Sequence, residues 1–178
     1  MSTQIVLLRA INVGSANRIA MPALREALGQ VGYDNVRTYL QSGNVVLDTD
    51  ARPDELAERF AALLAAQFNL NVPVIVRTRD ELREIVLRNP LADVAADPKR
   101  YQVSFLSGPL HPETVERLQG LRAEPERLVV EGREIYAWHP DGVARSKLWN
   151  GLAGKLGVTA TARNWTTVTA LLEIADDA

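Results

Sequence analysis

The fold is decided by the stretch Val36-Arg37-Thr38-Tyr39-Leu40-Gln41-Ser42-Gly43-Asn44-Val45-Val46-Leu47, which has the pattern of a β-hairpin. Residues 36–41 are expected to form one strand and residues 45–47 its partner. Ser42-Gly43 is expected to form the tight connection between them. The segments on either side show which fold this hairpin belongs to.

Those segments supply two helices and two more strands. Residues 4–8 form an apolar run that suits a buried strand, and residues 22–31 carry apolar side chains at helical spacing. After the hairpin come an alanine-rich helix at residues 53–68 and a strand at residues 72–76. The order β-α-β-β-α-β is typical of a ferredoxin-like arrangement, in which two helices cover one face of a four-stranded antiparallel sheet.

The same order of elements can be read in the second half of the chain, after a linking helix at residues 78–88 that Asn89-Pro90 ends. The expected strands lie at residues 101–106, 127–130, 134–138 and 158–162, and the expected helices at residues 112–121, 148–156 and 165–174. We therefore predict an α+β fold of two ferredoxin-like (βαββαβ) halves packed together, with a linking helix and a C-terminal helix.

The predicted division places the first ferredoxin-like subdomain at residues 1–77 and the linking helix and loop at residues 78–99. Residues 100–178 would form the second subdomain with the C-terminal helix. The repeat is one of element order only, so a single irregular α+β domain is the alternative.

Composition narrows the classes of function. The chain has 178 residues, 47% of them hydrophobic and 24% charged, which is typical of a globular protein with a sizeable core. A net charge of -2 and a pI near 5.7 argue against general nucleic-acid binding but leave a local basic patch open. The absence of cysteine excludes disulfides, thiolate metal sites and cysteine nucleophiles. Without a signal-like start or a bilayer-length apolar stretch, we expect a cytoplasmic protein with no membrane partner.

The first group of candidate site residues follows the first strand. Arg9, Asn12, Asn17 and Arg18 surround Gly14 in a polar loop that leads toward a helix. Arginines bind phosphate or carboxylate through paired hydrogen bonds, and backbone amides near a helix start attract anions. The alternative is that both asparagines bond to the local backbone and both arginines are solvated.

The second group lies at the connection of the hairpin. Gln41, Ser42 and Asn44 place two amides and a hydroxyl there, and we count all three as candidate ligand-binding residues. Ser42 lacks the G-x-S-x-G frame of a hydrolase nucleophile, and both histidines, His111 and His139, precede proline. The alternative is a turn in which Ser42 and Asn44 satisfy the backbone.

The third group lies near the C-terminal end. Asn164 occupies an N-cap position, so the amides of Trp165, Thr166 and Thr167 are expected to point outward at the start of the last helix. With Lys147 and Arg163 nearby, this arrangement predicts a phosphate or carboxylate site. The alternative is that Asn164, and Ser146 before the preceding helix, act only as helix caps.

Metal and carboxylate chemistry are not indicated. No H-x-x-x-H or D-x-D pair occurs, and the acidic residues fall mostly beside arginines on expected helix faces. No catalytic residue, cofactor or metal ligand is therefore assigned, and whether the protein is an enzyme stays open.

Four motifs carry a resemblance to a known family. Leu8-Arg9-Ala10-Ile11-Asn12-Val13-Gly14, Met21-Pro22, the residues 38–45 and the residues 162–168 together resemble the bacterial domain-of-unknown-function 1697 family. This chain departs from the expected family opening, because Ala10 replaces a glycine and Ser15-Ala16 replaces a glycine and a lysine. A loop lysine that would assist anion binding is therefore missing. The resemblance implies a duplicated ferredoxin-like α+β fold in a cytoplasmic bacterial protein, and it implies no activity.

Three functions compete at this point. The leading hypothesis is binding of a small anionic ligand, a nucleotide or phosphorylated metabolite, at loops between the two halves. The second is single-stranded nucleic-acid binding on the sheet face, where aromatic side chains stack on bases; the candidates are Tyr39, Tyr101, Phe105 and Tyr136. The third is an enzyme that stabilises charge through Arg9, Asn44, Lys147 and Arg163. A role in binding a protein partner is also left open, with no partner indicated.

Overall fold

The computed structural model describes residues 1–152 and 156–177 and divides into two compact units. Unit 1 contains Met1–Ile85 and the C-terminal residues from Ala170 onward, and unit 2 contains Val86–Thr169. Two helices contribute residues to both units, α3 (Arg79–Arg88) and α6 (Trp165–Asp176). The domain boundaries predicted near residues 77 and 99 stay predictions.

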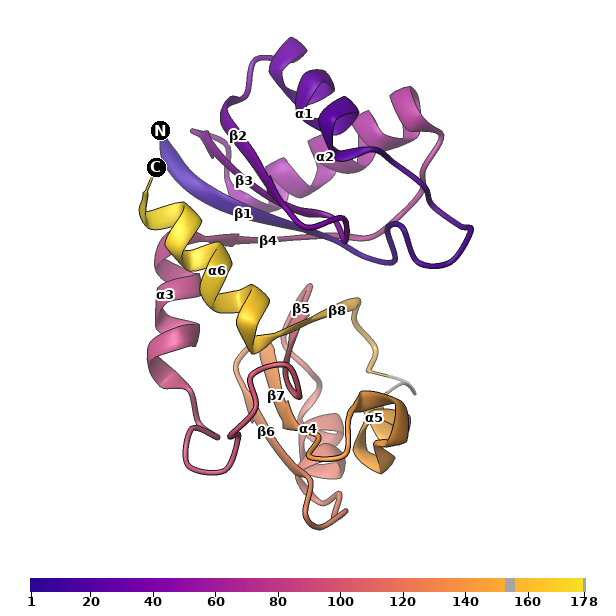
Figure 1. Ribbon diagram of the computed structural model, residues 1–178, viewed down its shortest axis with the longest axis vertical. Helices are drawn as coiled ribbons and strands as arrows, with labels where there is room; N and C mark the ends of the chain where they lie inside the picture. Colours follow the sequence, from indigo (N-terminus) through magenta and orange to yellow (C-terminus); the bar gives the residue numbers. More distant parts are fainter. Residues whose placement is uncertain (153–155, 178) are drawn as a thin grey trace. The chain divides into compact units, whose positions relative to one another are not determined.

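Unit 1 is built on the predicted hairpin. Its elements are β1 (Ser2–Leu8), α1 (Met21–Gln30), β2 (Asp34–Tyr39), β3 (Asn44–Thr49), α2 (Pro53–Phe68) and β4 (Val74–Thr78). The strands form an antiparallel sheet in the order β2-β3-β1-β4, and α1 and α2 lie on one face of it (Figure 1). This is the ferredoxin-like arrangement, so the prediction for the first half is confirmed.

The core of unit 1 lies between this sheet and its two helices. Val6 and Leu8 of β1 face Leu28 of α1 and Phe60 of α2, and all four side chains are fully buried. The helices begin where proline fits the first turn, and α2 ends at Asn69 in a left-handed conformation with φ 52°. Full burial of these apolar side chains gives the sheet a fixed face and hence a fixed register.

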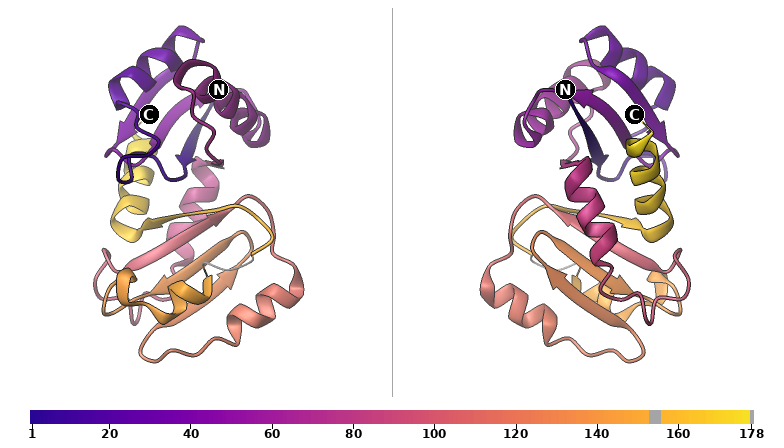
Figure 2. Two further views of the ribbon diagram at one scale, coloured as in Figure 1. Left: turned by 90° about the vertical axis from the view of Figure 1, so that its right-hand side faces the viewer. Right: turned by 90° about the vertical axis from the view of Figure 1, so that its left-hand side faces the viewer.

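Unit 2 repeats the same order of elements. It contains β5 (Tyr101–Leu106), α4 (Pro112–Gln119), β6 (Arg127–Glu131), β7 (Glu134–Trp138), a 3₁₀ turn (Val143–Arg145), α5 (Lys147–Leu152) and β8 (Ala160–Asn164). The sheet order is β6-β7-β5-β8, again antiparallel. Leu118 of α4 and Leu152 of α5 belong to the same core as Ile135 and Ala137 of β7. Both helices lie on one face of this sheet (Figure 2). The prediction of two ferredoxin-like halves is therefore confirmed.

The predicted strand bounds near the end of each half need correction. The strands expected at residues 72–76 and 158–162 are β4 and β8, which each begin two residues later. Pro73 has no N–H to donate to a ladder, and β4 pairs with β1 from Val74 to Thr78. The helix expected at residues 148–156 begins at Lys147, and residues 153–155 of that prediction lie outside the described residues.

The linking helix α3 begins with a reciprocal pair of hydrogen bonds. The backbone N–H of Thr78 donates to Glu81 Oε2 at 2.8 Å, and the N–H of Glu81 donates to Thr78 Oγ1 at 3.1 Å. This capping box satisfies two amide groups that the first turn would leave without partners.

Within residues 1–152 and 156–177, no helix is both long enough and apolar enough to cross a bilayer.

Candidate functional site

The loop that joins β1 to α1 has a defined backbone fold. Ala10, Asn12, Gly14 and Asn17 all adopt left-handed conformations, with φ 55°, 55°, 61° and 50°. The N–H of Asn12 donates to the carbonyl of Asn17 at 3.1 Å, and Arg18 donates to the carbonyl of Gly14 at 2.8 Å. The loop is therefore folded on itself.

Asn12 ties this loop to the connection between β2 and β3. Its amide nitrogen donates to the carbonyl of Ile19 at 2.9 Å and to the carbonyl of Gln41 at 2.7 Å. Its Oδ1 accepts from the N–H of Ile19 at 2.9 Å. The first and second groups of candidate residues are thus brought together at one edge of unit 1.

The asparagine side chains at this edge form hydrogen bonds within unit 1. Asn17 donates to the carbonyl of Ala10 at 3.1 Å. Asn44 is fully buried, and its amide donates to the carbonyl of Tyr39 at 2.9 Å and to Ser42 Oγ at 3.0 Å. Other candidate residues at this edge are exposed to solvent, namely Arg9, Gly14, Arg18, Gln41 and Ser42.

This edge of unit 1 is also where the sequence lacks acidic residues. Residues 5–25, 35–47 and 61–78 contain no aspartate or glutamate. They include the second half of β1 and the loop after it, most of β2 and β3, and β4. The arginines in these segments are Arg9, Arg18, Arg25, Arg37 and Arg77. A chain with a net charge of -2 therefore has three segments that reach this edge and whose charged side chains are all positive.

Two of these arginines, Arg9 and Arg18, are exposed in the loop after β1, although Arg18 also donates to the carbonyl of Gly14. Arg25 donates to Thr38 Oγ1, Arg37 donates to the carbonyl of Ile174, and Arg77 is buried. Arg9 and Arg18 are exposed, and within residues 1–152 and 156–177 neither has an acidic partner. We call the surface formed by Arg9, Arg18, Gln41 and Ser42 the basic edge.

The third group of candidate residues lies in unit 2 and has partners there. The N–H of Thr167 donates to Asn164 Oδ1 at 2.9 Å, and the N–H of Trp165 donates to the carbonyl of Pro98 at 3.1 Å. The expectation of outward-pointing amides at the start of the last helix is therefore wrong for these two residues. Asn164 acts as a cap, as the alternative interpretation held.

The N-terminus of α5 is already occupied by a carboxylate. Glu126 accepts from the N–H groups of Lys147 at 3.1 Å and Leu148 at 2.9 Å, and from Ser146 Oγ at 3.1 Å. Ser146 Oγ in turn accepts from the N–H of Trp149 at 2.8 Å, which confirms the predicted cap. The side chain of Lys147 is exposed there.

Arg163 is buried in β8. Its guanidinium donates to Thr161 Oγ1 at 2.8 Å and to the carbonyl of Ala162 at 2.9 Å. Burial lowers the pKa of Arg163 to about 10. The side chains of Arg163 and Asn164 thus form hydrogen bonds with neighbouring residues of the chain, whereas the side chain of Lys147 is exposed. A ligand shared by these three residues stays a prediction.

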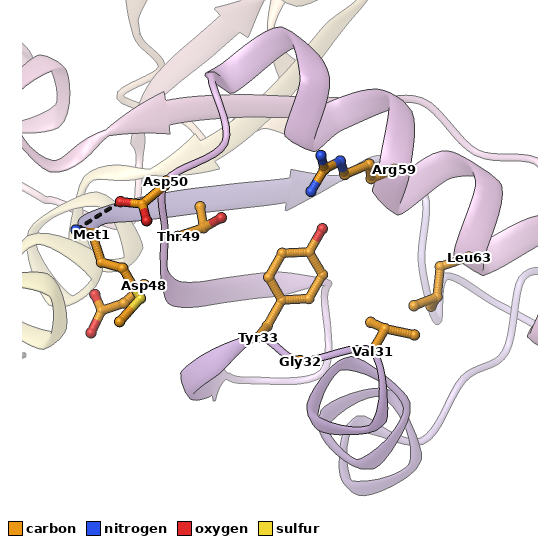
Figure 3. Close-up of a pocket in the computed structure, with 9 residues that line it drawn as sticks. All are labelled: Met1, Val31, Gly32, Tyr33, Asp48, Thr49, Asp50, Arg59 and Leu63. Carbon is orange, nitrogen blue, oxygen red and sulfur yellow. Dashed lines mark ion pairs between the residues drawn. The ribbon is translucent and has the colours of Figure 1, made fainter.

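A pocket of about 410 Å³ lies at the opposite end of the sheet of unit 1, near the start of β1 (Figure 3). Its lining consists of Met1, Val31, Gly32, Tyr33, Asp48, Thr49, Asp50, Arg59 and Leu63. A hydrogen bond from Asn35 is the main cause that holds the pKa of Asp48 below its usual value, and a bond from Thr3 adds to it. The sequence did not single out this pocket, because its residues come from four separate elements and carry no shared motif.

Metal chemistry has no support in the geometry. Among residues 1–152 and 156–177, no three histidine, cysteine or acidic side chains gather in an arrangement that could hold an ion.

His139 is a buried titratable group of unit 2 with a testable pH response. Its side chain is 1% exposed, and in the described part of the chain neither ring nitrogen has a hydrogen-bond partner. The ring lies edge-on to Trp149, with centroids 5.9 Å apart. Burial lowers the pKa of His139 below 6.5, and the charge of Glu126 opposes this more weakly.

We expect unit 2 to lose stability as the pH falls below about 6.5, because the unfolded chain then binds a proton that folded His139 does not. The loss is at most about 1.4 kcal/mol per pH unit from this one group. Urea unfolding at pH 7, 6 and 5, followed by tryptophan fluorescence, measures it. His139→Phe keeps an aromatic ring against Trp149, and a fall equally steep in this variant would assign the pH dependence to other groups.

The geometry and the comparisons together define what kind of protein this is. Two four-stranded antiparallel sheets, each with the βαββαβ order, make it an α+β protein of two ferredoxin-like halves. The chain belongs to a family described as proteins of unknown function, DUF1697, whose model matches residues 1–136. The motifs at residues 8–14 and 38–45 lie inside this match, and the one at residues 162–168 lies beyond it.

Solved structures support the same fold. The conserved bacterial protein SP0830 from Streptococcus pneumoniae is similar over 98% of this chain and 98% of its own, with a TM-score of 0.75 and 19% sequence identity. At this identity the similarity shows the fold alone. No curated protein matches the chain.

Proposed function

We propose that unit 1 binds a small anionic ligand, a nucleotide or a phosphorylated metabolite, at the basic edge. The observation that carries the proposal is the segregation of charge, because the three segments that meet at this edge contain no acidic residue and the loop after β1 adds exposed Arg9 and Arg18. Charges of one sign raise the local concentration of counter-ions without any requirement on net charge. Acidic residues such as Asp48, Asp50 and Asp80 lie at the other end of the sheet. At about 0.1 M salt, charges more than about 10 Å apart are largely screened from one another, so these residues weaken the positive potential at the basic edge little.

The folded backbone of the loop between β1 and α1, which we call the loop frame, supports binding because it fixes the positions from which Arg9 and Arg18 extend. Four left-handed residues and the hydrogen bonds of Asn12 hold the loop against the β2–β3 connection. Because this loop is already ordered in the folded protein, ligand binding loses little further conformational entropy of the backbone. Guanidinium groups bind phosphate oxygens in pairs, and the exposed amide of Gln41 is suited to a sugar or base.

The structure weakens the case for stacking of nucleic acid on a sheet face. Tyr101, Phe105 and Tyr136 are at most 1% exposed, so these rings are not accessible to bases. A small anion therefore fits the exposed groups better than a nucleic-acid strand does. We place this function in the cytoplasm, where such ligands are abundant, and the lack of cysteine agrees with that location.

The test is a titration of the protein with ATP, a sugar phosphate and inorganic phosphate at low salt, followed by calorimetry and amide chemical shifts. Arg9→Ala and Arg18→Ala are each expected to weaken binding about tenfold, because each removes charge-assisted hydrogen bonds. Added salt is expected to weaken binding as well, since both groups are exposed.

Arg52→Ala is the matched control, because it removes one exposed arginine of unit 1 outside the three segments without acidic residues. It should leave binding unchanged. Equal losses in Arg52→Ala and Arg9→Ala would show a nonspecific response to charge, and no shifts in residues 9–18 would exclude the basic edge as the site.

A further inference from the structure

The two sheets have four edge strands, and three of them carry features that prevent pairing with another chain. The pairing of β2 shifts in register between Asp34 and Arg37, where Asn35 is left-handed with φ 49°. Pro73 immediately precedes β4, and Arg77 within β4 is buried. In β8, Arg163 is buried. Bulges, prolines and inward-facing charges are the devices by which natural proteins protect exposed sheet edges.

The fourth edge strand, β6, has none of these features. Arg127-Leu128-Val129-Val130-Glu131 pairs with β7 in an unbroken register of five residues, from Arg127 opposite Trp138 to Glu131 opposite Glu134. No proline or glycine interrupts it, and Val129 and Val130 have high β propensity. β6 forms the end of its sheet, so one side of its backbone has no neighbouring strand in the described residues. Such a strand is a template for pairing.

The backbone groups on the open side can be assigned from the connection to β7. Only Gly132 and Arg133 join the two strands, with Gly132 left-handed at φ 56°. In a hairpin with a two-residue loop, the flanking pair, here Glu131 and Glu134, is a hydrogen-bonded pair. Because the pattern alternates, Leu128 and Val130 direct their N–H and C=O groups toward the open edge.

The charges at the two ends of β6 fit an antiparallel copy of the same strand. If Val129 lies on the two-fold axis, Leu128 faces Val130 of the second copy, so the outward groups of both strands form hydrogen bonds. In this register Arg127, which also pairs with exposed Glu124 of its own chain at 2.8 Å, lies opposite Glu131 of the second copy, and the pair between copies is formed twice.

We infer that β6 is the contact through which two copies of this chain associate, by antiparallel pairing of β6 with β6 centred on Val129. The contact joins the second sheets of two copies into one continuous sheet. Leu128 and Val130 pack on the core of their own unit and keep the strand in position for this pairing. The inference is independent of the proposed anion site, which lies in unit 1.

Charge reversal tests the register. Sedimentation at several protein concentrations should show a reversible monomer–dimer equilibrium for the natural chain. Arg127→Glu alone and Glu131→Arg alone should each give monomers, because each places like charges opposite one another. A mixture of the two variants should form a heterodimer, because every pair then has opposite charges. The double variant should dimerise alone.

A cysteine at the axis tests the contact directly, since the chain has no cysteine of its own. Val129→Cys should form a disulfide-linked dimer under mild oxidation, because the two side chains face each other across the axis. Ala162→Cys, at the centre of edge strand β8, is the matched control and should remain monomeric under the same conditions.

Three results would overturn the inference. One is a natural chain that stays monomeric up to millimolar concentration. Another is a dimer that both single reversals leave intact, since that dimer uses a different surface. The third is equal cross-linking of Val129→Cys and Ala162→Cys. Near-ultraviolet circular dichroism of each variant confirms that the comparison is made between folded proteins.

Discussion

Replacing Gly43 with alanine is expected to destabilise unit 1 by about 3 kcal/mol. Gly43 has φ 80°, and a Cβ atom there would lie 2.7 Å from Leu8 Cβ and 3.2 Å from Ile11 Cγ1. Its carbonyl accepts from the N–H of Leu8 at 2.8 Å, so the backbone cannot move away without losing that bond. The loss therefore combines overpacking of about 1–3 kcal/mol with left-handed strain of about 1–2 kcal/mol.

Gly14→Ala is the matched control for backbone strain. Gly14 has φ 61°, but a Cβ atom there would meet nothing within 4 Å, so the expected loss is about 1 kcal/mol. Urea unfolding followed by far-ultraviolet circular dichroism measures both variants. Tryptophan fluorescence is unsuitable, because Trp138, Trp149 and Trp165 all lie in unit 2. Equal losses in the two variants would mean that the contact with Leu8 does not restrict position 43.

The elements of unit 1 were predictable because local signals agree with the fold. The bounds predicted for the helix at residues 53–68 are those of α2, where proline fits the first turn and an apolar stripe ends before left-handed Asn69. The hairpin was predicted from Ser42-Gly43, and β3 lies between β2 and β1 as the topology requires. Strand bounds were less accurate where pairing decides them, as at β4, whose ladder follows the register of β1.

The candidate site was only partly predictable, because side-chain partners depend on contacts that are distant in sequence. Asn12 was a candidate for a ligand or for a local backbone bond, but one of its partners, the carbonyl of Gln41, lies 29 residues away. Glu126 was not noticed at all, although it caps α5 from about 20 residues away. The position of Arg163 in β8 turns its side chain into a buried environment, which charge alone does not reveal.

Asn12→Ala is expected to destabilise unit 1 by about 4 kcal/mol and to abolish measurable anion binding at the basic edge. The substitution removes three hydrogen bonds, to the N–H and carbonyl of Ile19 and to the carbonyl of Gln41, each worth about 1 kcal/mol. It also leaves alanine in a left-handed conformation at φ 55°, which asparagine tolerates better. Urea unfolding by circular dichroism and ATP titration measure the two effects.

Two further substitutions separate the causes. Asn12→Gly removes the same hydrogen bonds without backbone strain, so the difference between glycine and alanine combines that strain with the opposing effect of glycine's greater freedom in the unfolded chain. Asn12→Asp keeps an acceptor for the N–H of Ile19, so it should recover part of the stability. Because it adds a negative charge at the basic edge, it should bind ATP no better than Asn12→Ala does. If Asn12→Ala lost stability but bound ATP with unchanged affinity, the loop frame would serve folding only, and the anion site would not depend on the link between the loop and the β2–β3 connection.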